Sequence, residues 1–148
     1  MLLIEKVLIL KSLSMFQETP EPLLVEVASI IEEVDAEADT TLFKKGDTGN
    51  CLYIIYKGQV KIHLNEHTLA VLGENEFFGE LSLLDTEARS ASATTVGDTI
   101  LLKLDQEPFY ELMSNRVEVV KGIIKILCKR LREQNEKNLE LKARLQIL

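Results

Sequence analysis

The middle of this 148-residue chain consists of short apolar runs separated by turn residues, and this pattern limits the possible folds more than any other feature. Each run has four to six residues, and glycine, asparagine or aspartate stands between most neighbouring runs. Runs of this length and spacing are typical of strands in an antiparallel sandwich or closed barrel. We therefore predict strands at residues 40–43, 51–56, 59–64, 68–72, 91–96 and 99–104.

Helical patterns flank this region on both sides. Residues 3–16 are amphipathic, and Thr19-Pro20 opens a second helix that should reach about Glu33, because threonine caps helices and proline suits their first turn. Residues 107–113 and 117–148 return to a helical pattern. The chain is thus expected to comprise N-terminal helices at 1–38, a β-barrel at 39–105 and C-terminal helices at 106–148.

Apolar residues recur along the last helix in alternating steps of three and four. This heptad pattern is typical of helices that pair in parallel, and we expect a homodimer through this helix. The alternative is a single helix whose first half packs on its own barrel and whose last turns fray, and the off-pattern Ile123 and Ile126 indicate a second contact face for that first half. The heptad positions are Val117, Val120, Ile124, Leu127, Leu131, Gln134, Asn138, Leu141, Leu145 and Leu148, of which Gln134 and Asn138 are the polar ones.

Composition and charge exclude several classes of protein. With 46% hydrophobic and 28% charged residues, the chain resembles an ordinary globular protein. Residues 1–120 carry 9 basic and 21 acidic side chains, which disfavours direct nucleic-acid binding, while residues 121–148 carry 8 and 3. No uncharged apolar stretch is long enough to span a membrane, and no secretory cleavage site follows the apolar start. Cys51 and Cys128 are too few for a disulfide framework, so we expect free thiols and a soluble, cytoplasmic protein.

One interruption of the strand pattern points to anion chemistry. Residues 79–84 (GELSLL) form a helical turn that begins at a glycine, and such a turn presents unbonded backbone N–H groups. Arg89 follows at the start of the next strand, and its planar guanidinium suits phosphate. Glu80 can accept a hydrogen bond from a ribose hydroxyl, so phosphate and sugar together indicate a nucleotide. The alternative is an ordinary surface ion pair between Glu80 and Arg89.

These residues resemble a known family. The run FGELSLL followed by ARSASA is similar to the phosphate-binding cassette of the cyclic nucleotide-binding domain family, which includes the bacterial catabolite activator protein and the regulatory subunits of protein kinase A. The upstream run KGDTGNCLYIIYKGQV, residues 45–60, resembles the family's other hallmark. The resemblance covers nearly the whole chain. It implies a mainly β fold, an antiparallel Greek-key β-barrel (a jelly roll, or double-stranded β-helix) with N-terminal helices, a cassette at 78–92 and a long C-terminal helix.

The resemblance also implies roles for individual residues. Glu80 would bind the ribose hydroxyl and Arg89 the cyclic phosphate. The other ligand-binding positions implied are backbone groups of Gly79, Leu81 and Ser82, the hydroxyl and N–H groups of Ser90 and Ala91, the apolar side chains of Leu69 and Val71, and Arg130, Gln134 and Asn135 at the purine edge. For the last three residues, ordinary solvated or heptad positions remain an equal alternative.

The expected function is that of a regulatory sensor domain within a larger signalling protein. Its ligand would be cAMP rather than cGMP, because the family often has threonine where this chain has Ser90 when it prefers cGMP. Binding would move the C-terminal helix, and no further cofactor is expected. The main alternative is a degenerate barrel that mediates protein–protein contacts without a nucleotide.

A small enzyme of the metal-binding cupin type is the third reading. His63, Glu66 and His67 lie near one hairpin turn, but the chain has no third histidine, so we expect no metal site. No arrangement typical of nucleophilic or acid–base catalysis is present, and we expect no enzyme activity.

Overall fold

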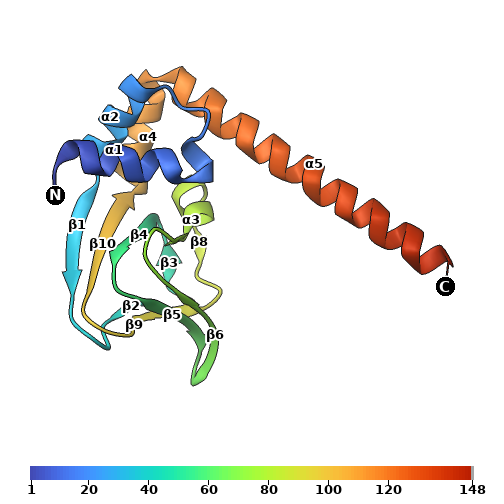
Figure 1. The fold of residues 1–148 in the computed structure, drawn as a ribbon, viewed down its shortest axis with the longest axis horizontal. Helices are drawn as coiled ribbons and strands as arrows, with labels where there is room; N and C mark the ends of the chain where they lie inside the picture. The colour runs from blue at the N-terminus through green and yellow to red at the C-terminus, as the bar shows by residue number, and fades with distance from the viewer. Residues whose placement is uncertain (148) are drawn as a thin grey trace. The chain divides into compact units, whose positions relative to one another are not determined.

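The structure, a computed structural model, describes residues 1–147. Within this range the chain forms two compact units. The β unit contains residues 29–112 together with Met1, and the helical unit contains residues 2–28 and the chain from Met113 onward. The long last helix and the strands can be followed in Figure 1.

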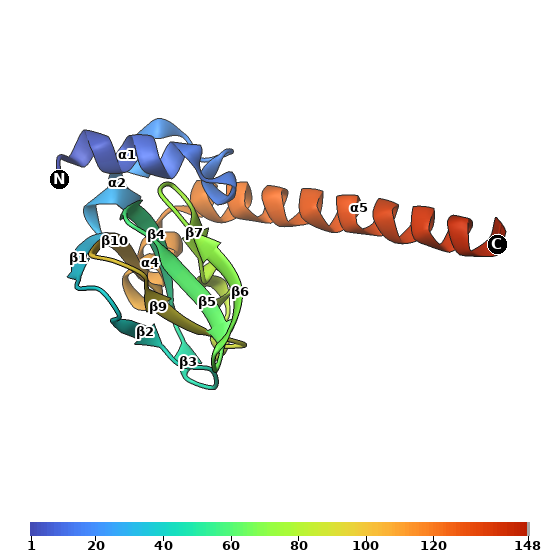
Figure 2. The same cartoon turned by 60° about the horizontal axis from the view of Figure 1, so that its bottom comes forward.

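The strands of the β unit are β1 (Glu32–Ala36), β2 (Thr41–Phe43), β3 (Thr48–Gly49), β4 (Cys51–Lys57), β5 (Val60–Leu64), β6 (His67–Leu72), β7 (Phe77–Phe78), β8 (Glu87–Ala88), β9 (Ser92–Thr95) and β10 (Thr99–Asp105). One antiparallel sheet has the order β1-β10-β4-β7 and a second has the order β2-β9-β5-β6 (Figure 2). The short strands β3 and β8 form a separate two-stranded ribbon. Two such sheets packed face to face make a jelly-roll barrel, which confirms the predicted fold class.

The core between the sheets follows the two-residue period of a strand. Tyr53 and Ile55 of β4 are buried in one cluster with Val60 of β5, Ala93 of β9 and Leu101 of β10. Ile55, Val60, Ala93 and Leu101 have no exposed surface at all. Burying one large aliphatic side chain contributes about 1.5–3 kcal/mol, so this cluster is a main source of the barrel's stability.

The first strand differs from the sequence prediction. We expect a helix to about Glu33, but α2 (Glu21–Ser29) ends earlier and β1 begins at Glu32. β1 lies at the edge of its sheet, and within residues 1–147 it pairs with β10 alone, with Val34 opposite Leu101. Its sequence EEVDA has only two apolar positions, Val34 and Ala36, so its period is too short to distinguish from the end of a helix.

The helical turn predicted between two strands is confirmed. Helix α3 (Glu80–Leu84) begins directly after Gly79, which has a φ of +86°. This left-handed backbone conformation favours glycine, since a β-carbon makes it costly. Helix α4 (Gln106–Asn115) then follows β10 without a loop.

The helical unit contains α1 (Leu3–Ser12), the 3-10 turn η1 (Ser14–Phe16), α2 and α5 (Val117–Ile147). Ile123 and Ile126 of α5 are buried, which confirms the second contact face predicted for this helix. Gly122 lies on the same face, and a β-carbon there would stand 3.3 Å from the Glu18 carbonyl oxygen. Over residues 1–147, no helix is both long and apolar enough to cross a bilayer.

Candidate functional site

The main chain of Arg89 is held by the turn at residues 44–47. The Arg89 N–H donates to the Asp47 carbonyl oxygen at 2.7 Å, and the Gly46 N–H donates to the Arg89 carbonyl oxygen at 2.8 Å. The Asp47 carboxylate closes the turn by accepting from the Lys44 N–H at 2.9 Å. The two sequence hallmarks of the resemblance therefore meet at Arg89, because one of them positions the backbone of the other.

The Arg89 guanidinium is buried, with 8% of the residue exposed. Its Nη2 donates to the Cys51 carbonyl oxygen at 3.0 Å and lies 3.4 Å from the Cys51 Sγ. Its central carbon lies 4.1 Å from the centre of the Phe43 ring, which is cation–π distance. Within residues 1–147, no carboxylate forms an ion pair with Arg89, and its Nε has no hydrogen-bond partner. A buried cation held in this way is a strong binding group for an anion.

Three aromatic rings pack beneath this cation. The Tyr53 and Phe78 rings stack at 5.3 Å between centres, and the Phe43 ring lies 6.2 Å from Tyr53 and 6.0 Å from Phe78. Burial raises the pKa of the Tyr53 phenol, and the neighbouring Cys51 side chain raises it further, while Arg89 lowers it. The phenol stays neutral, so it does not compete with an anion for the positive charge of Arg89.

Two glycines allow this close packing. A β-carbon at Gly79 would lie 2.6 Å from the Arg89 Nη1 and 2.8 Å from the Cys51 carbonyl oxygen. A β-carbon at Gly49 would lie 2.5 Å from the Ser82 Oγ and 2.7 Å from the Arg89 Nε. Gly49 has an ordinary φ, so it is required by space alone, whereas Gly79 is required by space and by its backbone conformation.

Helix α3 is fixed at its C-terminal end by side chains of α4. The Gln106 Nε2 donates to the Leu83 carbonyl oxygen at 3.2 Å and lies 3.4 Å from the Ser82 carbonyl oxygen. The Tyr110 hydroxyl donates to the Leu84 carbonyl oxygen. The last carbonyl groups of a helix have no partner within it, so these side chains satisfy them and hold α3 in place.

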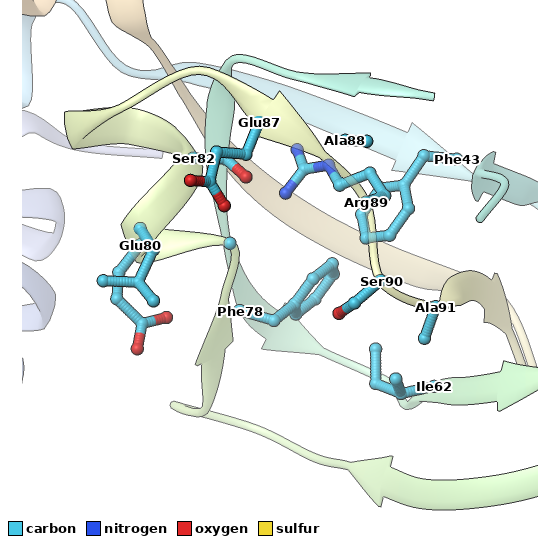
Figure 3. A pocket seen from close by; sticks show the side chains of 12 residues that line it. Phe43, Ile62, Phe78, Glu80, Ser82, Glu87, Ala88, Arg89, Ser90 and Ala91 are labelled. Atoms are coloured by element: carbon cyan, nitrogen blue, oxygen red, sulfur yellow. The ribbon is translucent and has the colours of Figure 1, made fainter. Parts of the chain in front are cut away.

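Residues from β2, β5, β7, α3, β8 and the segment around Arg89 line a cavity of about 300 Å³, called the pocket below (Figure 3). Phe43 of β2 and Ile62 of β5 form part of its apolar wall, and the cassette at 78–92 supplies the other lining residues, both polar and apolar. Seven residues that the resemblance implied as ligand-binding line it together: Gly79, Glu80, Leu81, Ser82, Arg89, Ser90 and Ala91. The other lining residues, which were not predicted from the sequence, are Phe43, Ile62, Phe78, Glu87 and Ala88.

Some of these missed residues left a signal in the sequence. Phe78 directly precedes Gly79, and Glu87 lies two positions before Arg89 within the cassette at 78–92. Phe43 and Ile62 had no local signal, because they reach the pocket from β2 and β5, far from the cassette in sequence.

Leu69 and Val71, which the resemblance implied as apolar walls for the ligand, are not among the residues that line the pocket. They lie on β6, where 52% and 51% of their surfaces are exposed. Ala70 pairs with the pocket residue Ile62, so Ala70 faces inward and its two neighbours face outward. Every residue of the run LAVL is apolar, so alternation in the sequence could not decide which face is buried.

The three implied residues of the last helix lie in the helical unit. The Arg130 Nη2 donates to the Ser14 Oγ, and the Gln134 Nε2 lies 3.4 Å from the Asn138 Oδ1. Asn135 is exposed. Their roles at a ligand stay predictions.

The hairpin histidine His63 is held within the barrel. Its Nδ1 lies 2.7 Å from the Asn65 carbonyl oxygen and its Nε2 lies 2.8 Å from the Thr94 Oγ1. In the part of the chain that the structure describes, no three metal-ligating side chains gather.

Comparison with known proteins identifies the family. Residues 33–116 match the cyclic nucleotide-binding domain. The chain is 30% identical over 132 residues to a CRP-like cAMP-activated global transcriptional regulator of Mycobacterium tuberculosis, covering 86% of this chain and 59% of the relative. It is 44% identical over 97 residues to the cyclic AMP receptor protein of Thermus thermophilus, covering 62% of this chain and 45% of the relative. The chain thus spans about half the length of these relatives.

A solved structure shows the same fold. The N-terminal domain of a transcriptional regulator from Streptomyces coelicolor superposes with a TM-score of 0.82 at 31% sequence identity, over 86% of this chain and 95% of that domain. The match to the family covers more than half of this chain and contains every residue that lines the pocket. The chain belongs to the cyclic nucleotide-binding domain family.

Proposed function

We propose that this chain is a regulatory domain that binds cAMP more tightly than cGMP. The observation that carries the proposal is the buried Arg89 guanidinium, which faces the pocket without an acidic partner among the described residues. A cavity of about 300 Å³ with a few polar groups on an apolar floor is suited to a small ligand. A cyclic nucleotide supplies the phosphate, the sugar and the flat apolar base that these groups fit.

In the proposed pose, Arg89 binds the cyclic phosphate through N–H groups of its guanidinium, of which the Nε has no partner among the described residues. Glu80, on the first turn of α3, accepts from the ribose 2′-hydroxyl. Backbone groups of Gly79, Leu81 and Ser82 approach the ligand at the same helix start, where N–H groups lack intrahelical partners. Ser90 and Ala91 donate to the phosphate or the base from the other side of Arg89.

The choice of cAMP over cGMP rests on Ser90 and on the last helix. Gln134 and Asn135 offer side-chain carbonyl oxygens that can accept from the exocyclic amine of adenine. With Arg130, they would meet the purine when the helix closes over it. Ligand binding then favours one arrangement of the helix, which is how occupancy becomes a signal.

The wider context of the proposal is a cytoplasmic, non-catalytic sensor in a larger signalling protein. The barrel of residues 39–105 receives the ligand, and residues 106–148 form the lid and pair with a second copy. The relatives in Mycobacterium and Thermus are named for cAMP and are about twice as long as their matched segments, which supports both the ligand and the larger architecture.

Calorimetric titration of the purified chain with cAMP and cGMP tests the proposal. We expect Arg89→Ala to weaken cAMP binding about 100- to 1000-fold, or roughly 3–4 kcal/mol, because the phosphate loses the one cationic side chain among the described residues that line the pocket. Arg144→Ala is the matched control, since this exposed arginine lies in the last turn of α5. Retained affinity in Arg89→Ala would contradict the pose. A folded wild-type chain that binds neither nucleotide would instead support the degenerate barrel.

A further inference from the structure

The charges around the pocket are unusual for an anion site. Among the twelve lining residues, Arg89 is the one base, and Glu80 and Glu87 are both acids. Glu80 has a place in the proposed pose, because it accepts from the ribose. Glu87 has none, and its negative charge works against anion binding.

The barrel aims Glu87 at the pocket. It lies on β8, paired with Gly49 of β3, two residues before Arg89. Its side chain lines the pocket together with that of Arg89. Figure 3 shows the Glu87 side chain on the α3 side of Arg89.

The Glu87 carboxylate has no bonding partner among the described residues. Within residues 1–147, it has no ion pair and no side-chain hydrogen bond. Glu87 is exposed, so the charge stays hydrated and its presence costs the fold little. The Glu87 charge therefore acts on a ligand that enters the pocket rather than on the stability of the fold.

We propose that Glu87 is a specificity-determining residue that rejects phosphates carrying a second negative charge. The inference rests on the proposed function, since it concerns the anion bound by Arg89. A cyclic phosphodiester carries one negative charge, which Arg89 neutralises. A phosphomonoester such as 5′-AMP carries nearly two at neutral pH, and the uncompensated charge is repelled by Glu87. Nucleoside diphosphates and triphosphates are disfavoured more strongly.

Competition titrations with cAMP and 5′-AMP on Glu87→Gln test this selectivity. Glutamine keeps the shape of the side chain and removes its charge. We expect the ratio of the two dissociation constants, 5′-AMP over cAMP, to fall roughly threefold to tenfold in Glu87→Gln. Glu66→Gln is the matched control, because it removes the same charge from an exposed turn outside the pocket and should leave the ratio unchanged.

The possible results separate this inference from the proposed function. If cAMP binds and the ratio is the same in Glu87→Gln as in the wild type, the inference is wrong and the proposed function stands. If 5′-AMP at about 10 mM displaces cAMP from neither the wild type nor Glu87→Gln, the inference is also wrong, because Glu87 is then not what excludes 5′-AMP. If the wild type does not bind cAMP, both fail. Because Glu87 is exposed, the effect should also shrink between roughly 50 and 500 mM salt, and an effect independent of salt contradicts a charge mechanism.

Discussion

Arg89 is the residue on which the site depends, and its neighbours explain why it can be buried. A carbonyl oxygen, a thiol and an aromatic ring surround the guanidinium and leave its charge uncompensated. A carboxylate in their place would satisfy the cation in the empty protein and would compete with any phosphate. The spacing of the cassette makes Arg89 recognisable in the sequence, but Phe43 and Cys51 come from other strands and become visible only when the barrel closes.

Gly49 is predicted to be required for ligand binding through space alone. In Gly49→Ala, the added β-carbon collides with the Ser82 Oγ and the Arg89 Nε, so Arg89 must turn away from its position. We expect cAMP affinity to fall about tenfold or more and the free energy of unfolding by about 1–3 kcal/mol, as in other overpacked sites. Gly97→Ala is the control, since nothing lies within 4 Å of its β-carbon. Calorimetry and thermal unfolding measure both effects, and equal affinity in the two variants contradicts the prediction.

At the scale of elements, α3 is too short to be stable by itself. It has five residues, and an isolated helix of this length does not form in water. Its position comes from Gly79 at one end and from the α4 side chains Gln106 and Tyr110 at the other. The α3 groups that line the pocket are therefore positioned in part by hydrogen bonds at the C-terminal end of the helix.

Gln106→Ala is predicted to loosen this helix. The variant leaves the Ser82 and Leu83 carbonyl oxygens without their donor, and it also removes the acceptor of the Thr86 hydroxyl at 2.8 Å. We expect the free energy of unfolding to fall by about 1–2 kcal/mol and cAMP affinity by a factor of roughly three to ten. Gln59→Ala, in the exposed turn between β4 and β5, is the matched control. The rate of amide hydrogen exchange in α3 should rise in Gln106→Ala. An unchanged rate there contradicts the role of Gln106 in holding α3.

The sequence predicts elements well where an apolar run is long or where glycine and other turn residues mark its ends. The strands near β4, β5 and β10 and the turn at α3 follow from apolar runs and from Gly79. β1 was not predicted because an edge strand buries few side chains. The inward face of β6 could not be predicted because every residue of LAVL is apolar. Seven cassette residues of the site were recognisable because they are adjacent in the chain. Phe43 and Ile62 were not, because the fold alone brings them there.

At the scale of the whole molecule, one face of α5 exposes a row of apolar side chains. Val117, Ile124, Leu131, Leu141 and Leu145 are 52–71% exposed, while Val119, Ile123 and Ile126 are buried on another face. The exposed residues are heptad positions, and Gln134 and Asn138 between them are exposed as well. Leu148 lies outside the described residues. A helix with one face packed in its own unit and a second apolar face in water has the pattern of a parallel coiled-coil dimer.

Replacing two leucines of this face is predicted to separate the dimer without affecting the pocket. Leu141→Lys with Leu145→Lys places charges at two adjacent core positions of the coiled coil, whose burial is costly. We expect sedimentation equilibrium at about 10 μM to show a monomer for this variant and a dimer for the wild type. Ala143→Lys with Gln146→Lys adds the same charge off the heptad positions and should remain dimeric. A wild type that is monomeric even at about 100 μM contradicts the dimer. Equal cAMP affinity in monomer and dimer would place the whole binding site within one chain, whereas weaker binding by the monomer would mean that pairing helps to close α5 over the base.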